Sequence, residues 1–75
     1  MNSLRYIGKT WKVGDFVYRA ETRFWPLRFG HILKLHKQEY QDAYSVGLFN
    51  YIAEVVWQNG EISEINLGHL ELVNE

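Results

Sequence analysis

Residues 22–29, TRFWPLRF, gather the side chains of this chain that are best suited to binding. Tryptophan and arginine are enriched at the points of an interface that contribute most of its binding energy. Pro26 fixes its own backbone and holds Trp25 extended, so we expect a stiff loop with Trp25 exposed and Phe29 buried. The loop predicts docking onto a partner protein, with the contact residues Arg23, Phe24, Trp25, Arg28, Tyr18 and Trp57. The alternative is that these rings fold back and cap one end of the core.

Basic residues in the first half of the chain favour a second kind of partner, a nucleic acid. Small barrels bind nucleic acids by combining phosphate contacts with stacking of bases on aromatic rings. The net charge of −1 and the pI of about 6.3 count against this interpretation, because dedicated nucleic-acid-binding domains are strongly basic. Nucleic acid therefore stands as the alternative partner, with the candidate residues Arg19, Arg23, Arg28, Lys34 and Lys37.

Residues with catalytic or metal-binding chemistry do not form a recognisable pattern. Cysteine is absent, none of the serines lies in a nucleophile elbow, and the glycines are too dispersed to make a phosphate loop. His31 and His36 are five residues apart on one predicted strand, so a regular strand would put them on opposite faces, and His69 lies in a turn. We therefore expect neither an enzyme, nor a metal site, nor a cofactor.

Charge is divided unevenly along the chain. All eight Lys and Arg residues lie within residues 1–37, whereas seven of the nine Asp and Glu residues lie within residues 38–75. Such asymmetry predicts an electrostatic binding face. The alternative is that basic and acidic strands pair across a sheet and neutralise each other.

The size of the chain limits its architecture to one domain. A chain of 75 residues without cysteine needs a dense core, and its twelve aromatic residues fit that need. No apolar run approaches the ~20 residues that span a bilayer, and no signal peptide is recognisable. We expect a soluble, cytoplasmic protein that makes no contact with membranes.

Strand patterns dominate the rest of the sequence, and no helix of ordinary length is expected. Residues 38–50 read as a long connection, and Asn59-Gly60 predicts a hairpin with a type I′ turn, in which both residues take positive φ. Residues 66–69 read as a short helical turn capped by Asn66. Residues 1–12 read as a lead-in without a strand. The predicted strands are residues 16–21, 31–37, 51–58, 61–65 and 70–73. Strands of this number and length predict a small barrel.

Three segments resemble Tudor-type SH3-like barrels, in the order in which that family has them. They are TWKVGD (10–15), VVWQNGEISEI (55–65) and NLGHLELV (66–73). The resemblance implies a single all-β, five-stranded SH3-like barrel with a short helical turn before its last strand, a core spanning about residues 11–74, and Leu70 as a plug.

An aromatic cage for methylated lysine or arginine is the ligand site that this resemblance implies. The matching positions fall near Glu21, Arg28 and Asn59, and Trp57 is the one aromatic residue close to a cage position. A methyl-lysine or methyl-arginine reader is therefore a further alternative. The leading hypothesis is a non-enzymatic module that binds a protein through its first loop, such as a small accessory protein of a phage or a bacterium.

Overall fold

The computed structural model describes residues 2–39 and 48–73 and shows an all-β architecture, as predicted. The elements are β1 (Ser3–Tyr6), β2 (Lys9–Lys12), β3 (Phe16–Arg19), β4 (Arg28–Glu39), β5 (Phe49–Trp57), β6 (Ile62–Asn66), a 3₁₀ turn η1 (Leu67–His69) and β7 (Glu71–Leu72). The predicted long connection is shorter than residues 38–50, because both of its ends belong to β4 and β5.

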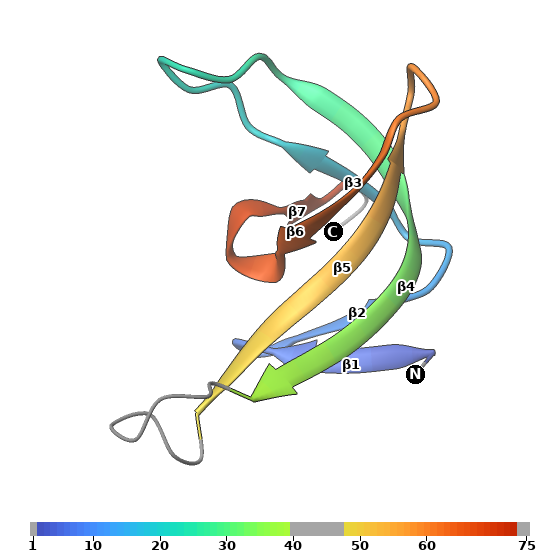
Figure 1. Cartoon of the computed structure of the whole chain (residues 1–75), viewed down its shortest axis with the longest axis vertical. Helices are drawn as coiled ribbons and strands as arrows, with labels where there is room; N and C mark the ends of the chain where they lie inside the picture. Colours follow the sequence, from blue (N-terminus) through green and yellow to red (C-terminus); the bar gives the residue numbers. More distant parts are fainter. Residues whose placement is uncertain (1, 40–47, 74–75) are drawn as a thin grey trace.

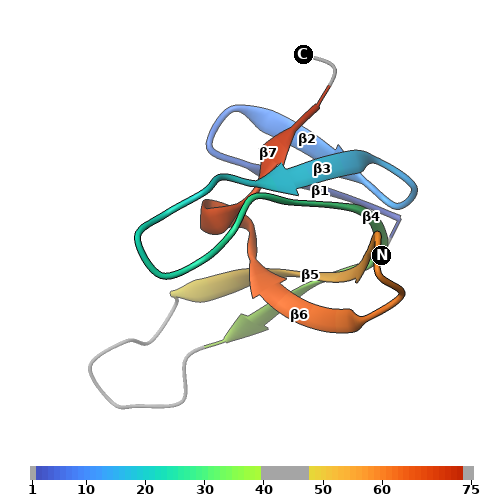
Figure 2. The ribbon, with the colours of Figure 1, turned by 90° about the horizontal axis from the view of Figure 1, so that it is seen from above.

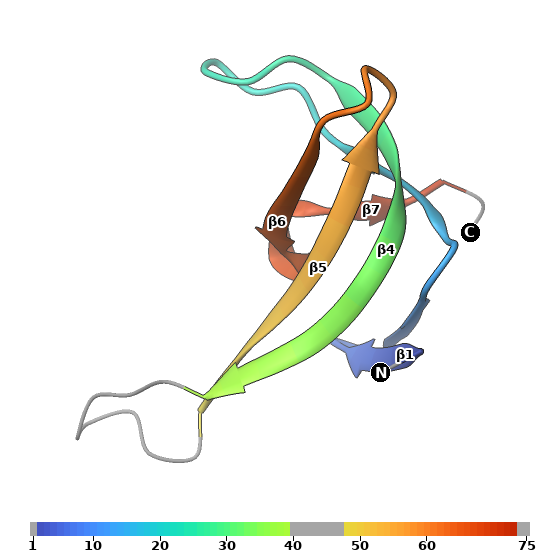
Figure 3. The same cartoon turned by 45° about the vertical axis from the view of Figure 1, so that its right-hand side comes forward.

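A five-stranded antiparallel sheet with the order β6-β5-β4-β3-β7 forms the body of the molecule (Figure 1). Strands β3 and β6 flank the β4–β5 pair on its two sides (Figure 2). The long strands β4 and β5 bend along their length, and the sheet curls with them (Figure 3). Among the described residues no hydrogen-bonded ladder joins the edge strands β6 and β7, so the predicted closure of a barrel is not observed.

Residues 1–12 contain a hairpin that the sequence analysis did not predict. Strands β1 and β2 pair through a two-residue turn in which Ile7 and Gly8 have φ of 46° and 75°. This turn was not recognisable from the sequence, because Ile7 is β-branched and such residues rarely take positive φ. Leu4 and Trp11 are cross-strand partners that join the core, so the core begins before residue 11, where we expected it to start.

The hairpin between β5 and β6 lies at the predicted place but has a different turn. Only Gly60 has positive φ, at 89°, so the predicted type I′ turn is wrong. The Gly60 amide donates to the Trp57 carbonyl at 2.9 Å, and the Trp57 amide donates to the Glu61 carbonyl at 2.8 Å. These bonds enclose a three-residue loop with a bulge at the glycine. The Asn59 side chain accepts from the Glu61 amide at 3.0 Å, which stabilises the bulge.

An irregularity in β4 overturns the expected placement of two histidines. The β4–β5 register shifts between Ile32 and Lys34, and His31 pairs with Val56 while His36 pairs with Ile52. Val56 and Ile52 are four residues apart on β5, so both histidines leave the sheet on one face. A bulge adds one residue to its strand and reverses the alternation beyond it. The expectation of opposite faces is therefore wrong.

The end of the chain follows the prediction closely. Asn66 caps η1 by accepting a hydrogen bond from the Gly68 amide at 2.9 Å. Leu70 is buried, and the short strand β7 pairs with β3.

Gly30 lies where β4 passes so close to β5 that a side chain has no room. A Cβ there would lie 2.5 Å from the Val56 carbonyl oxygen and 2.7 Å from Val55 Cγ1. Both distances are shorter than real Cβ contacts, so β4 approaches β5 this closely only with glycine at this position. Around this contact the core packs Val17, Ile32, Val55, Trp57 and Leu67, among others.

Candidate functional site

Residues 20–27 connect β3 to β4 and stand at the same end of the molecule as the β5–β6 hairpin (Figures 1 and 3). Thr22 organises this loop: its Oγ1 accepts from the amides of Phe24 and Trp25 at 3.2 and 3.0 Å. The Thr22 amide donates in turn to the Trp25 carbonyl at 2.8 Å. These three hydrogen bonds hold the turn from within the loop itself.

Large apolar side chains are exposed on this loop. Phe24 is 81% exposed, and Trp25 and Leu27 are each 50% exposed. The expectation of an exposed Trp25 is confirmed. Phe29, expected to be buried, is half-buried on the outer face of the sheet, where its ring lies 5.7 Å from Phe16 and 5.9 Å from Tyr18. Tyr18 belongs to this outer cluster and not to the tip of the loop.

Three arginines, Arg23 within the loop and Arg19 and Arg28 at its two ends, each lie over an aromatic ring. The Arg19 guanidinium is 4.7 Å from the centre of the Trp25 ring, and that of Arg23 is 5.9 Å from Phe24. The Arg28 guanidinium is 4.6 Å from the Trp57 ring. A guanidinium at this distance is attracted by the face of the ring. We call Arg19, Arg23, Phe24, Trp25, Leu27 and Arg28 together the loop surface.

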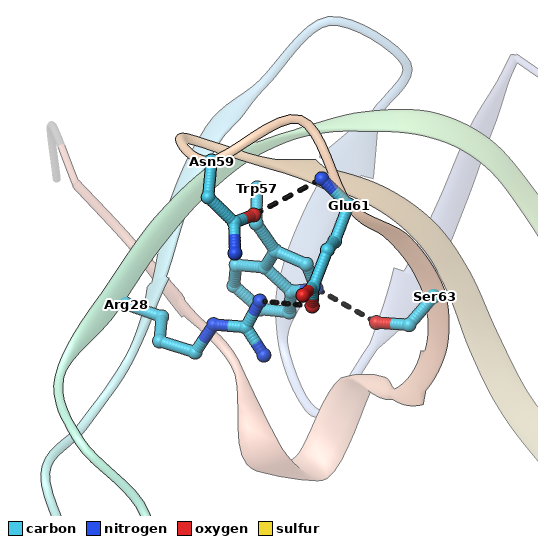
Figure 4. A network of polar contacts seen from close by, with 5 residues as sticks. All are labelled: Arg28, Trp57, Asn59, Glu61 and Ser63. Atoms are coloured by element: carbon cyan, nitrogen blue, oxygen red, sulfur yellow. Dashed lines mark hydrogen bonds and ion pairs between the residues drawn. The ribbon is translucent and has the colours of Figure 1, made fainter.

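A polar network fixes Arg28 on Trp57 (Figure 4). Arg28 Nη2 donates to Glu61 Oε2 at 3.1 Å, and Trp57 Nε1 donates to Ser63 Oγ at 2.7 Å. Trp57 is only 4% exposed and belongs to the core. We expected Trp57 to contact a partner, but Arg28 covers its ring and burial hides the rest. Trp57 therefore supports the loop surface from beneath and leaves little of its own surface for a partner.

The two lysines proposed for nucleic-acid binding lie away from the arginines. Lys34 is the cross-strand partner of Glu54 in the middle of the sheet. Lys37 lies toward the far end of β4, with its amino group 5.6 Å from the Phe49 ring and 5.9 Å from the Tyr51 ring. The structure therefore brings Arg19, Arg23 and Arg28 together and separates both lysines from them.

Ion pairs join the basic half of the chain to the acidic half. Lys9 Nζ lies 3.5 Å from Glu71 and Arg28 Nη2 lies 3.1 Å from Glu61, while His36 Nε2 lies 3.4 Å from Glu64. These contacts favour mutual neutralisation over two separate charged faces. Arg19 and Arg23 are different, because neither has a carboxylate partner among residues 2–39 and 48–73.

Sequence reasoning left Thr22, Leu27 and Glu61 out of the candidate set. Thr22 and the two amides that it caps form a local threonine turn, a pattern that residue type and spacing allow but do not demand. Glu61 meets Arg28 across 33 positions of sequence, so no local pattern could indicate the pair.

The loop surface offers exposed rings and guanidinium groups to solvent. Within the described part of the chain no group of three or more His, Cys, Asp or Glu side chains could hold a metal ion. Within the same residues no helix has the length and apolar character needed to cross a bilayer. Comparison of the chain with protein-family models, curated proteins and solved structures finds no match.

Proposed function

We propose that this protein is a non-enzymatic binding module that docks onto a partner protein through the loop surface. The observation that carries the proposal is the exposure of Phe24, Trp25 and Leu27 on a turn whose backbone Thr22 already holds. A partner that covers exposed apolar side chains stabilises the complex by ~25 cal/mol for each Å² of apolar surface removed from water. A loop already held in one shape loses less conformational entropy on binding.

We propose further that the curled sheet, although open between β6 and β7, is related to the SH3-like barrels of the Tudor type. The strand order, the bent strands β4 and β5, and the 3₁₀ turn before β7 support this assignment (Figure 1). A reader of methylated lysine or arginine is not favoured, because the chain's own Arg28 occupies the face of Trp57. A cytoplasmic location, expected because no signal peptide and no membrane-spanning run is recognisable, stays a prediction.

Single-stranded nucleic acid is the second candidate partner. Exposed rings next to Arg19 and Arg23 are favourable for base stacking combined with phosphate contact. The separation of Lys34 and Lys37 from the arginines counts against it, because a nucleic acid needs a continuous basic track.

Selection from a library of random short peptides displayed on phage tests the proposal. We expect peptides that bind the parent protein and bind Phe24→Ala about tenfold more weakly, as is typical of an interface hot spot. Phe49→Ala is the matched control, because Phe49 is also exposed and also lies beneath a cationic side chain, Lys37. Peptides that bind the parent and Phe24→Ala equally well would contradict the proposal.

A further inference from the structure

Building on the proposed docking function, we infer that the partner segment carries an aspartate or glutamate beside an apolar side chain, and that Arg19 and Arg28 bind its carboxylate. The partner is thus an acidic segment of a protein, recognised by one charge and one apolar contact.

Two arginines lie directly opposite each other on neighbouring strands. Arg19 and Arg28 are Cα partners at the end of the β3–β4 ladder, so their side chains leave the sheet on the same face. That face is the core side, because Val17 and Gly30, two positions along the strands, are buried there. Like charges directly opposite each other destabilise a sheet. An anion between them would turn this repulsion into attraction to a shared partner.

The charge of this arginine pair is only partly neutralised. Arg28 uses one terminal nitrogen, Nη2, for Glu61, and its other N–H groups have no partner among the described residues. Arg19 lies on the Trp25 ring and has no carboxylate partner within the described ranges. A guanidinium carries five donors in a planar fork that matches a carboxylate. The pair therefore has donors available for an incoming carboxylate.

The surroundings favour a single carboxylate over a run of phosphates. Glu61 is within hydrogen-bonding distance of Arg28, and a hollow beside Arg19 is lined by Glu71 as well as by Thr22 and His69. A polyanion that continued past the arginines would meet these acidic groups and be repelled. A short segment with one acidic side chain avoids them.

An apolar contact lies next to the arginines. Leu27 and Phe29 line a hollow whose other wall is the hairpin residues Trp57, Gln58 and Asn59, with Arg28 on its edge. Leu27 is half exposed, so an apolar side chain of the partner can cover it. A carboxylate at Arg28 and an apolar group on Leu27 would come from neighbouring residues of one extended segment.

The test uses the same displayed peptide library and reads the sequences that the parent protein enriches. We expect enriched peptides to hold Asp or Glu beside an apolar residue, and binding to Arg19→Gln to be about tenfold weaker than to the parent. Lys34→Gln is the matched control that removes one exposed positive charge elsewhere, and it should bind almost as the parent does. Replacing the peptide's acid by its amide should weaken binding to the parent but have little effect on Arg19→Gln.

The possible outcomes separate this inference from the proposed function. Enriched peptides without acids, whose binding is lost in Phe24→Ala but kept in Arg19→Gln, would overturn the inference and leave the docking function intact. Peptides insensitive to both substitutions, or no enriched peptides, would overturn both. Binding of oligothymidylate at moderate salt, tighter than any acidic peptide and steeply weakened by added salt, would replace the acidic segment with a nucleic acid.

Discussion

Two buried tryptophans, one near each end of the core, have contrasting surroundings. Trp57 donates its indole N–H to Ser63 and has Arg28 stacked on its ring, at the end that carries the loop surface. Trp11, 2% exposed on the β1–β2 hairpin, has an indole nitrogen that finds no hydrogen-bond partner in the described part of the chain. At the Trp57 end, the indole N–H therefore has a hydrogen-bond partner and the ring has a cationic neighbour. The Trp11 ring is held without a hydrogen bond from its indole nitrogen, so the two ends of the core differ in how they hold their tryptophan.

The largest effect is expected from closing the space that Trp57 and its strand need. Gly30→Ala would place a methyl group 2.5 Å from the Val56 carbonyl oxygen and 3.1 Å from the Trp57 ring. Overpacking of this kind lowers the free energy of unfolding by about 3 kcal/mol. Urea denaturation measures the loss, and Gly68→Ala, whose nearest neighbours are side-chain atoms at 3.3 and 3.4 Å, is the milder control. An unchanged midpoint for Gly30→Ala would refute the close approach of β4 and β5.

Truncating each tryptophan in the same way measures the contrast directly. Trp57→Phe removes part of a ring and a hydrogen bond and weakens a cation–π contact, and it should lower the free energy of unfolding by about 2–3 kcal/mol. Trp11→Phe removes the same atoms, but the N–H that it removes is buried and lacks a partner. Loss of this unsatisfied group offsets part of the destabilisation. We expect the cost of Trp11→Phe in urea denaturation to be smaller by about 1–2 kcal/mol. Equal costs would show that the two environments do not differ energetically.

The smallest effect is expected at the turn of the Trp11 end. Ile7 has φ of 46° and is 78% exposed, so its side chain is strained without being packed. Ile7→Asn should raise the free energy of unfolding by about 1 kcal/mol, because asparagine takes this backbone conformation more easily. The binding of peptides to the loop surface should be unchanged. A loss of stability would mean that Ile7 makes contacts that outweigh its strain.

Elements marked by residues close together in the sequence were predicted correctly, whereas features that depend on contacts between strands were missed. Asn66 is a short-range signal of a capped turn and was predicted correctly. The resemblance implied a buried Leu70, and Leu70 is buried. The first hairpin was missed because its turn places Ile7 where glycine or asparagine would be the usual signal. The bulge in β4 that aligns His31 with His36 depends on how β4 meets β5, which no pattern within β4 reveals.

The candidate site was predictable in composition but not in arrangement. An exposed Trp25 followed from the crowding of rings and arginines around Pro26. The roles of Trp57 and Glu61 did not, because Arg28 reaches both only after the sheet has folded. Long-range pairing of this kind also explains why the uneven charge of the sequence becomes a set of ion pairs in space.

The chain holds three tryptophans, and only Trp25 among them is exposed. Indoles in water and indoles in a core differ in emission wavelength and in their access to dissolved quenchers. Trp25 therefore places an intrinsic fluorophore within the loop surface, while Trp11 and Trp57 supply a constant background from the interior. A partner that covers the loop would shift and protect the exposed fraction alone, so that occupancy of this surface can be followed by light emission from the unlabelled protein.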